Sequence, residues 1–171
     1  GRIAIRTRDP SPVGLFMEYL DDPEATAKVF VGDWYYTGDK ATMDEDGYYW
    51  LVGRDDDIIK SSGYRISPAE DESALMTHPC GKESAVVGSP DPIRGVIVKA
   101  FVCLKDGWTG SDDLIRELQT HVKSTTAPYK YPRAIEFVEE LPKTISGKVR
   151  RVELRDREIQ RYKEQNEHQD E

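Results

Sequence analysis

The chain has 171 residues, 37% hydrophobic and 33% charged, a balance typical of a soluble globular protein of one domain or one and a half. Its 24 basic and 32 acidic residues give a net charge of −8, which argues against a general nucleic-acid binder because such proteins carry a basic surplus. There is no run of about 18 apolar residues, so we expect no membrane span. We also expect no signal peptide.

Cysteines and histidines give no sign of a disulfide framework or a metal site. Cys80 and Cys103 have neither CxxC spacing nor a nearby pair of histidines, so we expect free thiols in a reducing compartment. His78, His121 and His168 are scattered, and we expect no metal site in this stretch. The chain begins with "GRIAIR", already in the alternation of a strand and without methionine, so we expect a fragment of a longer protein.

The first third of the chain is expected to be mostly β. Residues 3–6 alternate apolar and charged side chains, which predicts a strand. Residues 22–30, "DPEATAKVF", predict a short helix with the aspartate as N-cap and the proline at the first helical position. Residues 33–54, "DWYYTGDKATMDEDGYYWLVGR", predict a hairpin that turns at the Asp-Gly step.

Hairpin, helix and strand signals alternate in the middle of the chain. Residues 56–67, "DDIIKSSGYRIS", predict a second hairpin with its turn at the Ser-Gly step. The following "SPAE", residues 67–70, predicts a capping box, and the helix it opens should end before "HP" at residues 78–79. Residues 83–91 and 97–105 predict two strands around the turn-rich "SPDPIRG".

The last third contains two predicted helices and one strand. Residues 111–123 predict an amphipathic helix capped by Ser111, and its apolar stripe is Leu114, Ile115, Leu118 and Val122. Residues 134–141, "AIEFVEEL", predict a strand, and residues 149–163 predict a charged helix. Residues 164–171, "EQNEHQDE", predict a frayed polar tail.

The order of elements predicts the α+β class, with a small mixed sheet covered by helices and a mostly β segment before it. We place a boundary at residues 55–57, because three adjacent carboxylates repel one another and suit an exposed linker. This divides the chain into a β-rich part (1–54), the linker, an α+β domain (58–163) and the tail (164–171).

Three short motifs are candidates for chemistry. "YTGD" ends at Asp39, "GRDDDIIKSSGYR" contains Arg54, Asp56, Gly63 and Arg65, and "PKTISGK" ends at Lys148. Taken singly, each has an ordinary structural interpretation: a turn, a surface cation, a hairpin glycine or a solvated lysine. The Ser-Gly-Lys step is also no phosphate-binding P-loop, because it lacks the GxxxxGK[ST] pattern.

Together and in this order, the motifs resemble the C-terminal third of the adenylate-forming ligases, which include acyl-CoA synthetases, peptide-synthetase adenylation domains and luciferases. "GRDDDIIKSSGYRISPAE" and "TAPYKYPRAIEFVEELPKTISGKVRR" are most similar to the medium-chain acyl-CoA synthetases. The resemblance covers essentially the whole chain. It implies that residues 1–54 end a large AMP-binding domain, that 55–57 form a hinge, and that 58–163 form a mobile C-terminal lid domain.

The resemblance implies a reaction in two halves. A carboxylate attacks the α-phosphate of ATP to give acyl-adenylate and pyrophosphate, and the CoA thiol then displaces AMP. The resemblance places Lys148 between the carboxylate and the α-phosphate in the first half-reaction, where a compact cation lowers the barrier. It places Asp39 on the ribose hydroxyls, which suits an acceptor-only carboxylate, and Arg54 and Arg65 on the nucleotide. ATP enters as its magnesium complex and CoA is the co-substrate.

The resemblance gives the second half-reaction a different set of residues. It implies a domain swing about Asp56, which brings Ser62, Gly63 and Tyr64 to the wall of the pantetheine tunnel. Further CoA contacts implied by the resemblance are Arg94, Lys123, Tyr131, Pro132 and Arg133. An ordinary surface interpretation of these residues stays open. Two interpretations also stay open for the cations Lys148, Arg150, Arg151 and Arg155. They form either a positive field for anionic substrates or the solvated face of a helix.

Two residues depart from the family pattern. Asp71 stands where an aliphatic residue is usual, and its helical spacing to Ala74 and Leu75 places it on the inner face. An unpaired buried carboxylate costs several kcal/mol, which its position in the first helical turn softens. Gly81 stands where a β-branched residue is usual. Both bear on local packing.

A phosphate-binding loop and an acyl pocket are missing, and the family carries both in the large N-terminal domain. We therefore expect the fragment alone to be inactive and the missing N-terminal domain to be its partner. Two alternatives stay open: an adenylation domain that loads a carrier protein, and a detached non-catalytic module that binds CoA or a partner. The location is expected to be intracellular, cytoplasmic in a prokaryote and the mitochondrial matrix for a eukaryotic medium-chain enzyme.

Overall fold

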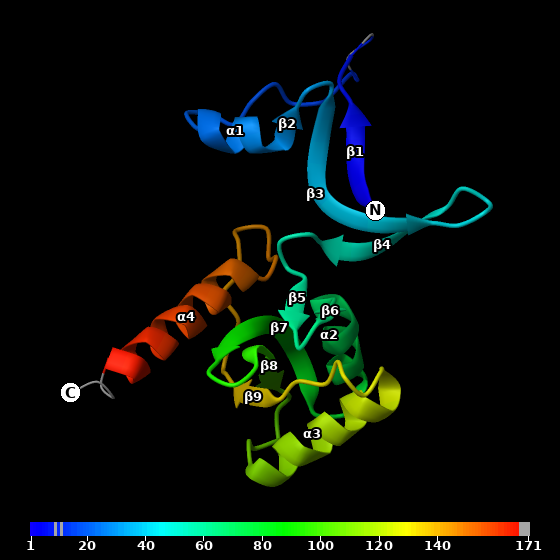
Figure 1. Cartoon of the computed structure of the whole chain (residues 1–171). Coiled ribbons are helices and arrows are strands. Elements are labelled where there is room, and N and C mark those ends of the chain that lie inside the picture. The colour runs from blue at the N-terminus through cyan, green and yellow to red at the C-terminus, as the bar shows by residue number, and fades with distance from the viewer. Residues whose placement is uncertain (9, 11, 168–171) are drawn as a thin grey trace. The chain divides into compact units, whose positions relative to one another are not determined.

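The computed structural model describes residues 1–8, 10 and 12–167. The chain divides into two compact units, Gly1–Asp56 and Asp57 onward, each described by itself below (Figure 1). In the described part of the chain, no helix has the length and apolar character needed to cross a membrane.

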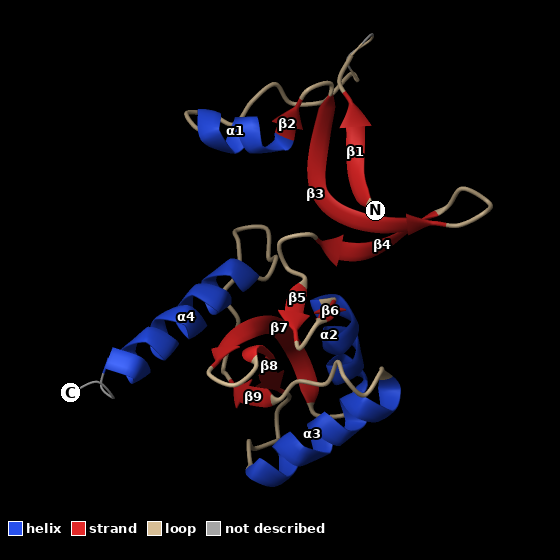
Figure 2. Ribbon diagram, in the orientation of Figure 1, coloured by secondary structure: helices blue, strands red, loops and turns tan. Residues whose placement is uncertain are grey.

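In its described residues, the first unit is an antiparallel sheet with one short helix (Figure 2). Its elements are β1 (Arg2–Arg6), α1 (Pro23–Val29), β2 (Phe30–Val31), β3 (Trp34–Met43) and β4 (Tyr49–Arg54). The long strand β3 pairs with all three others, always antiparallel. The predicted strand, helix and hairpin are therefore confirmed.

Local signals explain these elements. The Asp22 carboxylate caps α1 by accepting a hydrogen bond from the Ala25 N–H at 2.8 Å. Gly47 has φ +85° in the turn between β3 and β4, a conformation that favours glycine. The Asp44 carboxylate accepts from the indole of Trp50 and the N–H of Tyr48 in the same turn, and these bonds lower its pKa.

In residues 57–167, the second unit contains a mixed three-stranded sheet, a two-stranded hairpin and three helices. Its elements are β5 (Ile59–Ser61), β6 (Tyr64–Ile66), α2 (Pro68–Thr77), β7 (Gly81–Asp91), β8 (Gly95–Leu104), α3 (Asp112–Thr125), β9 (Ala134–Phe137) and α4 (Arg151–Glu167). In the order β7-β8-β9, the first pairing is antiparallel and the second parallel. The predicted α+β class is confirmed.

Alternation along β7 and β8 builds a core on each face of this sheet. Val86, Val98 and Ala100 face α2 and α3 and join the larger cluster. Val87 and Phe101 face the other way and pack with Leu154 of α4 and Leu141. The helices therefore cover both faces, α2 and α3 on one side and α4 on the other (Figure 2). The free thiols of Cys80 and Cys103 are buried among these clusters, and burial raises the pKa of both.

The capping box predicted for α2 is wrong in its side chains. Ser67 occupies the N-cap position, but its side chain makes no capping hydrogen bond. The Glu70 carboxylate, which should reach back to residue 67, instead accepts two 2.6 Å bonds from Lys130 Nζ. A long-range ion pair has replaced the local one, while Pro68 at the first helical position is as predicted.

Three predicted bounds in the last third are also wrong. Strand β9 ends at Phe137, short of residue 141. Helix α4 begins at Arg151 because the preceding residues are held extended: Val149 bridges Lys143, and the Arg150 N–H donates to Pro142 O at 2.8 Å. The helix continues through Glu167, so the polar tail predicted from residue 164 is helical in its first four residues. Residues 168–171, including His168, lie outside the described residues.

Candidate functional site

Asp39, Arg54 and Asp56 lie side by side in the first unit. Asp39 and Arg54 are register partners across β3 and β4, and 3.6 Å separates Arg54 Nη1 from Asp39 Oδ1. Arg54 also donates from Nε to Asp56 Oδ1 at 3.1 Å and from Nη1 to Thr37 O at 3.1 Å. A Cβ on Gly38 would lie 2.8 Å from the guanidinium, so the glycine of "YTGD" is what lets Arg54 lie flat on the strand.

Asp55 and Asp57, on either side of Asp56, are neutralised within different units. In the first unit Asp55 accepts from Lys40 and from Arg2 Nε at 2.7 Å, and the bond from Lys40 is the largest cause of its lowered pKa. In the second unit Asp57 pairs with Arg151 and Arg155. The expectation that all three carboxylates are exposed is therefore wrong, because basic partners hold both outer ones.

The hairpin of β5 and β6 presents Ser62, Gly63 and Tyr64 at its tip. Ser62 has φ +48° and Gly63 φ +83°, as a two-residue turn of type I′ requires. The Tyr64 ring stacks on Tyr129, with centroids 4.2 Å apart and an interplanar angle of 16°. Arg94 Nη1 approaches Ser62 Oγ at 3.5 Å, which joins this tip to the turn between β7 and β8.

A second group gathers the predicted residues of the loop before β9. Lys123 Nζ lies 3.9 Å from the centroid of Tyr131, and Arg133 donates from Nη1 to the Tyr131 hydroxyl at 3.1 Å. The Gln119 amide fixes the loop by donating to the carbonyls of Pro132 and Arg133 at 3.1 Å. The structure thus joins Lys123, Tyr131 and Arg133.

Two residues beside these groups were not among the candidates from the sequence: Tyr129, which stacks on Tyr64, and Lys130, which pairs with Glu70. The alternation of aromatic and basic residues in "YKYPR" was a signal that could have found them. Arg65 stands on β6, and its exposed side chain makes no hydrogen bond or ion pair with any residue that the structure describes.

Lys148 stands on a small closed loop. The Lys143–Val149 bridge closes it, Thr144 N–H donates to Lys148 O at 2.8 Å, and Lys148 N–H donates to Thr144 Oγ1 at 3.1 Å. Gly147 allows the turn with φ +81°. The Lys148 side chain is exposed and, within the described ranges, makes no hydrogen bond or ion pair.

The arginines that follow Lys148 do not form an open basic field. Arg150 pairs with Glu153 at 3.0 Å, Arg151 with Glu72 at 2.6 Å and Arg155 with Asp57. Of the four predicted cations, only Lys148 has no carboxylate partner in the part of the chain that the structure describes.

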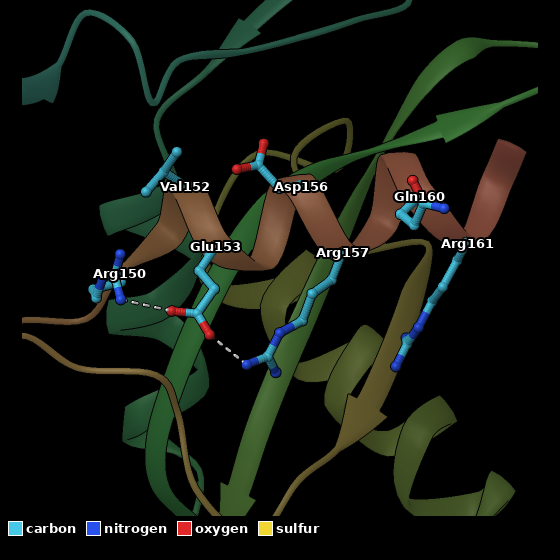
Figure 3. Close-up of a pocket in the computed structure, with 7 residues that line it drawn as sticks. All are labelled: Arg150, Val152, Glu153, Asp156, Arg157, Gln160 and Arg161. Atoms are coloured by element: carbon cyan, nitrogen blue, oxygen red, sulfur yellow. Dashed lines mark hydrogen bonds and ion pairs between the residues drawn. The ribbon is translucent and has the colours of Figure 1, made fainter.

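A groove of about 790 Å³ runs along the outer side of α4 (Figure 3). Its lining is Arg150, Val152, Glu153, Asp156, Arg157, Gln160 and Arg161. Glu153 bridges Arg150 and Arg157, so these three charged side chains of the groove pair with one another. Residues 1–8, 10 and 12–167 contain no cluster of three histidine, cysteine or acidic side chains able to hold a metal ion.

Comparison with known proteins finds a family match within the second unit. Residues 70–148 match the family described as the AMP-binding enzyme C-terminal domain. Over these residues the chain is similar to the C-terminal domain of the AMP-binding enzymes. This match includes Arg94, Lys123, Tyr131 and Arg133 and ends at Lys148.

The chain is also similar to proteins named as acyl-CoA synthetases and ligases. The mitochondrial acyl-coenzyme A synthetase ACSM1 of Homo sapiens is 62% identical over 160 residues, 92% of this chain and 28% of that protein. The mitochondrial acyl-coenzyme A synthetase ACSM3 of Mus musculus is 59% identical over 160 residues, with the same shares. The anthranilate CoA ligase AuaEII, crystallised with anthranoyl-AMP, is 46% identical with a TM-score of 0.74, over 82% of this chain and 27% of that one. The chain spans little more than a quarter of these relatives.

Gly81 and Asp71, the two departures from the family pattern, differ in their structural explanation. A Cβ on Gly81 would lie 2.7 Å from the carbonyl oxygen of Leu75 at the end of α2, so the close approach of helix and strand requires glycine. Asp71 is fully buried, as predicted, and neither carboxylate oxygen has a hydrogen-bond partner in the described chain. Burial, and secondarily the charge of Glu70, raises the pKa of Asp71 to about 7.

Proposed function

We propose that this chain is the C-terminal portion of an AMP-forming acyl-CoA synthetase that activates a carboxylic acid, a medium-chain fatty acid, with ATP and transfers the acyl group to CoA. The observation that carries the proposal is the 62% identity to a human acyl-coenzyme A synthetase over 92% of the chain. The exposed Lys148 loop at the end of the matched domain supports it.

The proposed chemistry assigns the first half-reaction to Lys148, Asp39 and the arginines. A carboxylate oxygen attacks the α-phosphorus of magnesium-bound ATP, the bond to the bridging oxygen breaks, and pyrophosphate leaves. Lys148 stabilises the charge where the two anions meet, and its lack of an internal ion pair supports this role. Asp39 accepts from the ribose hydroxyls, while Arg54 and Arg65 contact the nucleotide.

In the second half-reaction the CoA thiol attacks the acyl carbon, the acyl–oxygen bond breaks, and AMP leaves. We assign the pantetheine path to Ser62, Gly63 and Tyr64. Arg94, Lys123, Tyr131, Pro132 and Arg133 are assigned to the rest of CoA. The contacts of Arg94 with Ser62, and of Lys123 and Arg133 with Tyr131, support two basic groups beside that path.

We propose that Asp56 is the hinge of a domain alternation between the two half-reactions. Residues 55–57 join the end of the AMP-binding domain (1–54) to the mobile domain (58–163). The division of the structure into compact units between Asp56 and Asp57 supports this assignment.

The exposed apolar side chains of β4 support a missing partner domain. Tyr49 and Leu51 are each 71% exposed and Trp50 63% exposed, a cluster that a free soluble surface does not normally carry. We propose that the large N-terminal part of the same protein covers them and supplies the phosphate loop and acyl pocket. The chain alone is then inactive.

The test uses the full-length protein with ATP, CoA and straight-chain carboxylic acids of increasing length. We expect AMP, pyrophosphate and a CoA thioester in equal amounts, with the highest kcat/KM for medium-chain acids. Acyl transfer to a carrier-protein phosphopantetheine and not to free CoA would establish the carrier-loading alternative. Micromolar binding of CoA or AMP to the isolated chain in calorimetry, with an inactive full-length protein, would establish the non-catalytic module.

The mitochondrial names of the relatives support the mitochondrial matrix as the location of the protein in a eukaryote, and a prokaryotic protein would be cytoplasmic. Cell fractionation with a matrix marker tests the eukaryotic case. Recovery of the protein in the cytosol would contradict it.

A further inference from the structure

Four charged side chains form one ion cluster in the second unit: Asp57, Glu72, Arg151 and Arg155. Arg151 donates two parallel hydrogen bonds to the Glu72 carboxylate, from Nε to Oε1 at 2.8 Å and from Nη2 to Oε2 at 2.6 Å. Its third nitrogen, Nη1, donates to Asp57 Oδ2 at 3.3 Å, and Arg155 donates to the other oxygen of Asp57. Both carboxylates are 13% exposed, so solvent screens the cluster little.

The cluster ties together segments that are far apart in sequence. Arg151 is the first residue of α4, Glu72 lies on α2, and Asp57 is the first residue after the unit boundary. Glu72 Oε1 also accepts from the Val86 N–H of β7 at 2.9 Å. The guanidinium of Arg151 therefore links the start of α4 to α2 and, through Glu72, to β7. It also links the start of α4 to Asp57, the first residue of the second unit.

The Lys148 loop is fixed through the same anchor. Arg151 follows Lys148 by three residues, and the intervening residues are held by the Lys143–Val149 bridge and by the bond from Arg150 N–H to Pro142 O. The closed loop has little freedom relative to the start of α4. The place of Lys148 within the second unit therefore depends on what holds Arg151.

The side chains on either side of Asp56 are held by different units. Asp55 is bound to Arg2 and Lys40 of the first unit, and Asp57 to Arg151 and Arg155 of the second. Asp55 is fixed to the first unit and Asp57 to the second, so backbone rotation between the units is confined to Asp56, which lies between them. A rotation there carries Asp57 and all that is fixed to it.

We propose that Arg151 is a positioning residue that, with Asp57 and Glu72, makes the Lys148 loop move as one body with the residue after the hinge. This inference rests on the proposed function, in which Lys148 serves adenylation and Asp56 is the hinge. Arg151 touches no substrate in this scheme. It acts by holding Lys148 in a defined position relative to the α-phosphate. This position matters because a displacement of about 1 Å can lower the rate on the order of a hundredfold.

The test compares the two half-reactions of the full-length protein. Adenylation is followed by pyrophosphate exchange, and thioester formation starts from preformed acyl-adenylate and CoA. Arg151→Met removes the charge and the fork but keeps side-chain length. We expect it to lower the adenylation kcat about tenfold to a hundredfold, with less than about a threefold change in thioester formation. Arg151→Lys, which keeps the charge without the fork, should fall between.

A double variant separates positioning through Lys148 from a general weakening of the fold. In the Lys148→Ala background, Arg151→Met should add less than about a threefold further loss of adenylation, because the group that it positions is gone. Arg116→Met is the matched control: it breaks the exposed Arg116–Asp113 pair on α3 and should leave both rates unchanged. If Arg151→Met fails to fold, Asp57→Asn takes its place in the same comparison.

Losses that multiply in the double variant, or equal losses in both half-reactions, would overturn the inference. Unchanged adenylation in a folded Arg151→Met protein would do the same. These outcomes require an active wild-type protein. A wild-type protein that adenylates no acid would instead overturn the proposed function, so the two failures are distinguishable.

Discussion

Asp39 and Arg54 face each other across the ladder of β3 and β4, with 3.6 Å between Oδ1 and Nη1. This separation is longer than a hydrogen bond, whereas Arg54 donates hydrogen bonds to Asp56 and to Thr37. The Asp39 carboxylate is therefore held beside a cation with acceptor capacity left over. That is the arrangement a group that accepts from two hydroxyls needs.

Asp39→Asn should raise the KM for ATP about tenfold or more in the full-length protein. The amide replaces one acceptor oxygen by a donor, and a hydrogen bond to a charged group contributes on the order of 1.5–3 kcal/mol. Initial-rate kinetics at varied ATP measures the effect. Asp46→Asn, in the exposed turn of the same hairpin, is the control, and an equal KM in both variants would remove Asp39 from the nucleotide site.

Lys148→Ala should lower adenylation by at least about a hundredfold and leave thioester formation from preformed acyl-adenylate close to wild type. The cation is needed where carboxylate and triphosphate meet, and no such encounter occurs in the second half-reaction. Pyrophosphate exchange and single-turnover thioester formation measure the two steps. Lys163→Ala, another exposed lysine, should change neither, whereas equal losses in both steps for Lys148→Ala would contradict the assigned role.

Gly63→Leu should have the opposite effect, with thioester formation lost and adenylation retained. The space at the Gly63 Cβ position is open in the chain itself, so a leucine there would project into the path proposed for pantetheine. Backbone strain at φ +83° is a second effect of the change. Gly107→Leu controls for it, because Gly107 has φ +86° and equally open space. Loss of pyrophosphate exchange in Gly63→Leu alone would refute the assignment.

Local signals in the sequence predicted the elements, whereas long-range partners had to be seen in the structure. The Asp22 and Ser111 caps and the turn at Gly47 depend on residues within about four positions, and all were predicted. The stack of Tyr64 on Tyr129 joins residues 65 positions apart, and the Arg151–Glu72 pair joins residues 79 apart. Such pairs follow from the register of the sheet and the placement of helices on it, which no local pattern encodes.

The same dependence on long-range partners limited what the sequence predicted about the candidate site. Resemblance pointed to Lys148 and Asp39, but not to the ion pairs that occupy Arg151 and Arg155, so the sequence left open a basic field that the structure closes. The capping box at residues 67–70 failed for this reason too, because Lys130 takes the carboxylate that the local pattern assigned to the helix end. The burial of Asp71 was predicted because helical spacing alone determines it.

Asp71→Leu should stabilise the chain, and by more at pH 8 than at pH 5. The carboxyl group is fully buried without a hydrogen-bond partner, and its pKa is raised from 3.8 to about 7. Between these values the folded chain holds a proton that the unfolded chain has released. Asp71 therefore makes the folded state less stable as the pH rises through this window, by up to about 1.4 kcal/mol per pH unit. Leucine removes the ionisation and fills the position with the aliphatic character that its surroundings favour.

Urea denaturation at several pH values between 4.5 and 8.5 measures the free energy of unfolding of wild type and variant. Other groups titrate in this range, so the quantity that isolates Asp71 is the difference between the two proteins. That difference should grow with pH up to about 7 and then level off, because above this pH the folded and the unfolded wild-type chain both carry the Asp71 charge. Asp106→Leu, at an exposed position, should give a difference that does not change with pH. A difference for Asp71→Leu that is equally flat would mean that the buried carboxyl group keeps its ordinary pKa, through a water or a rearrangement that solvates it.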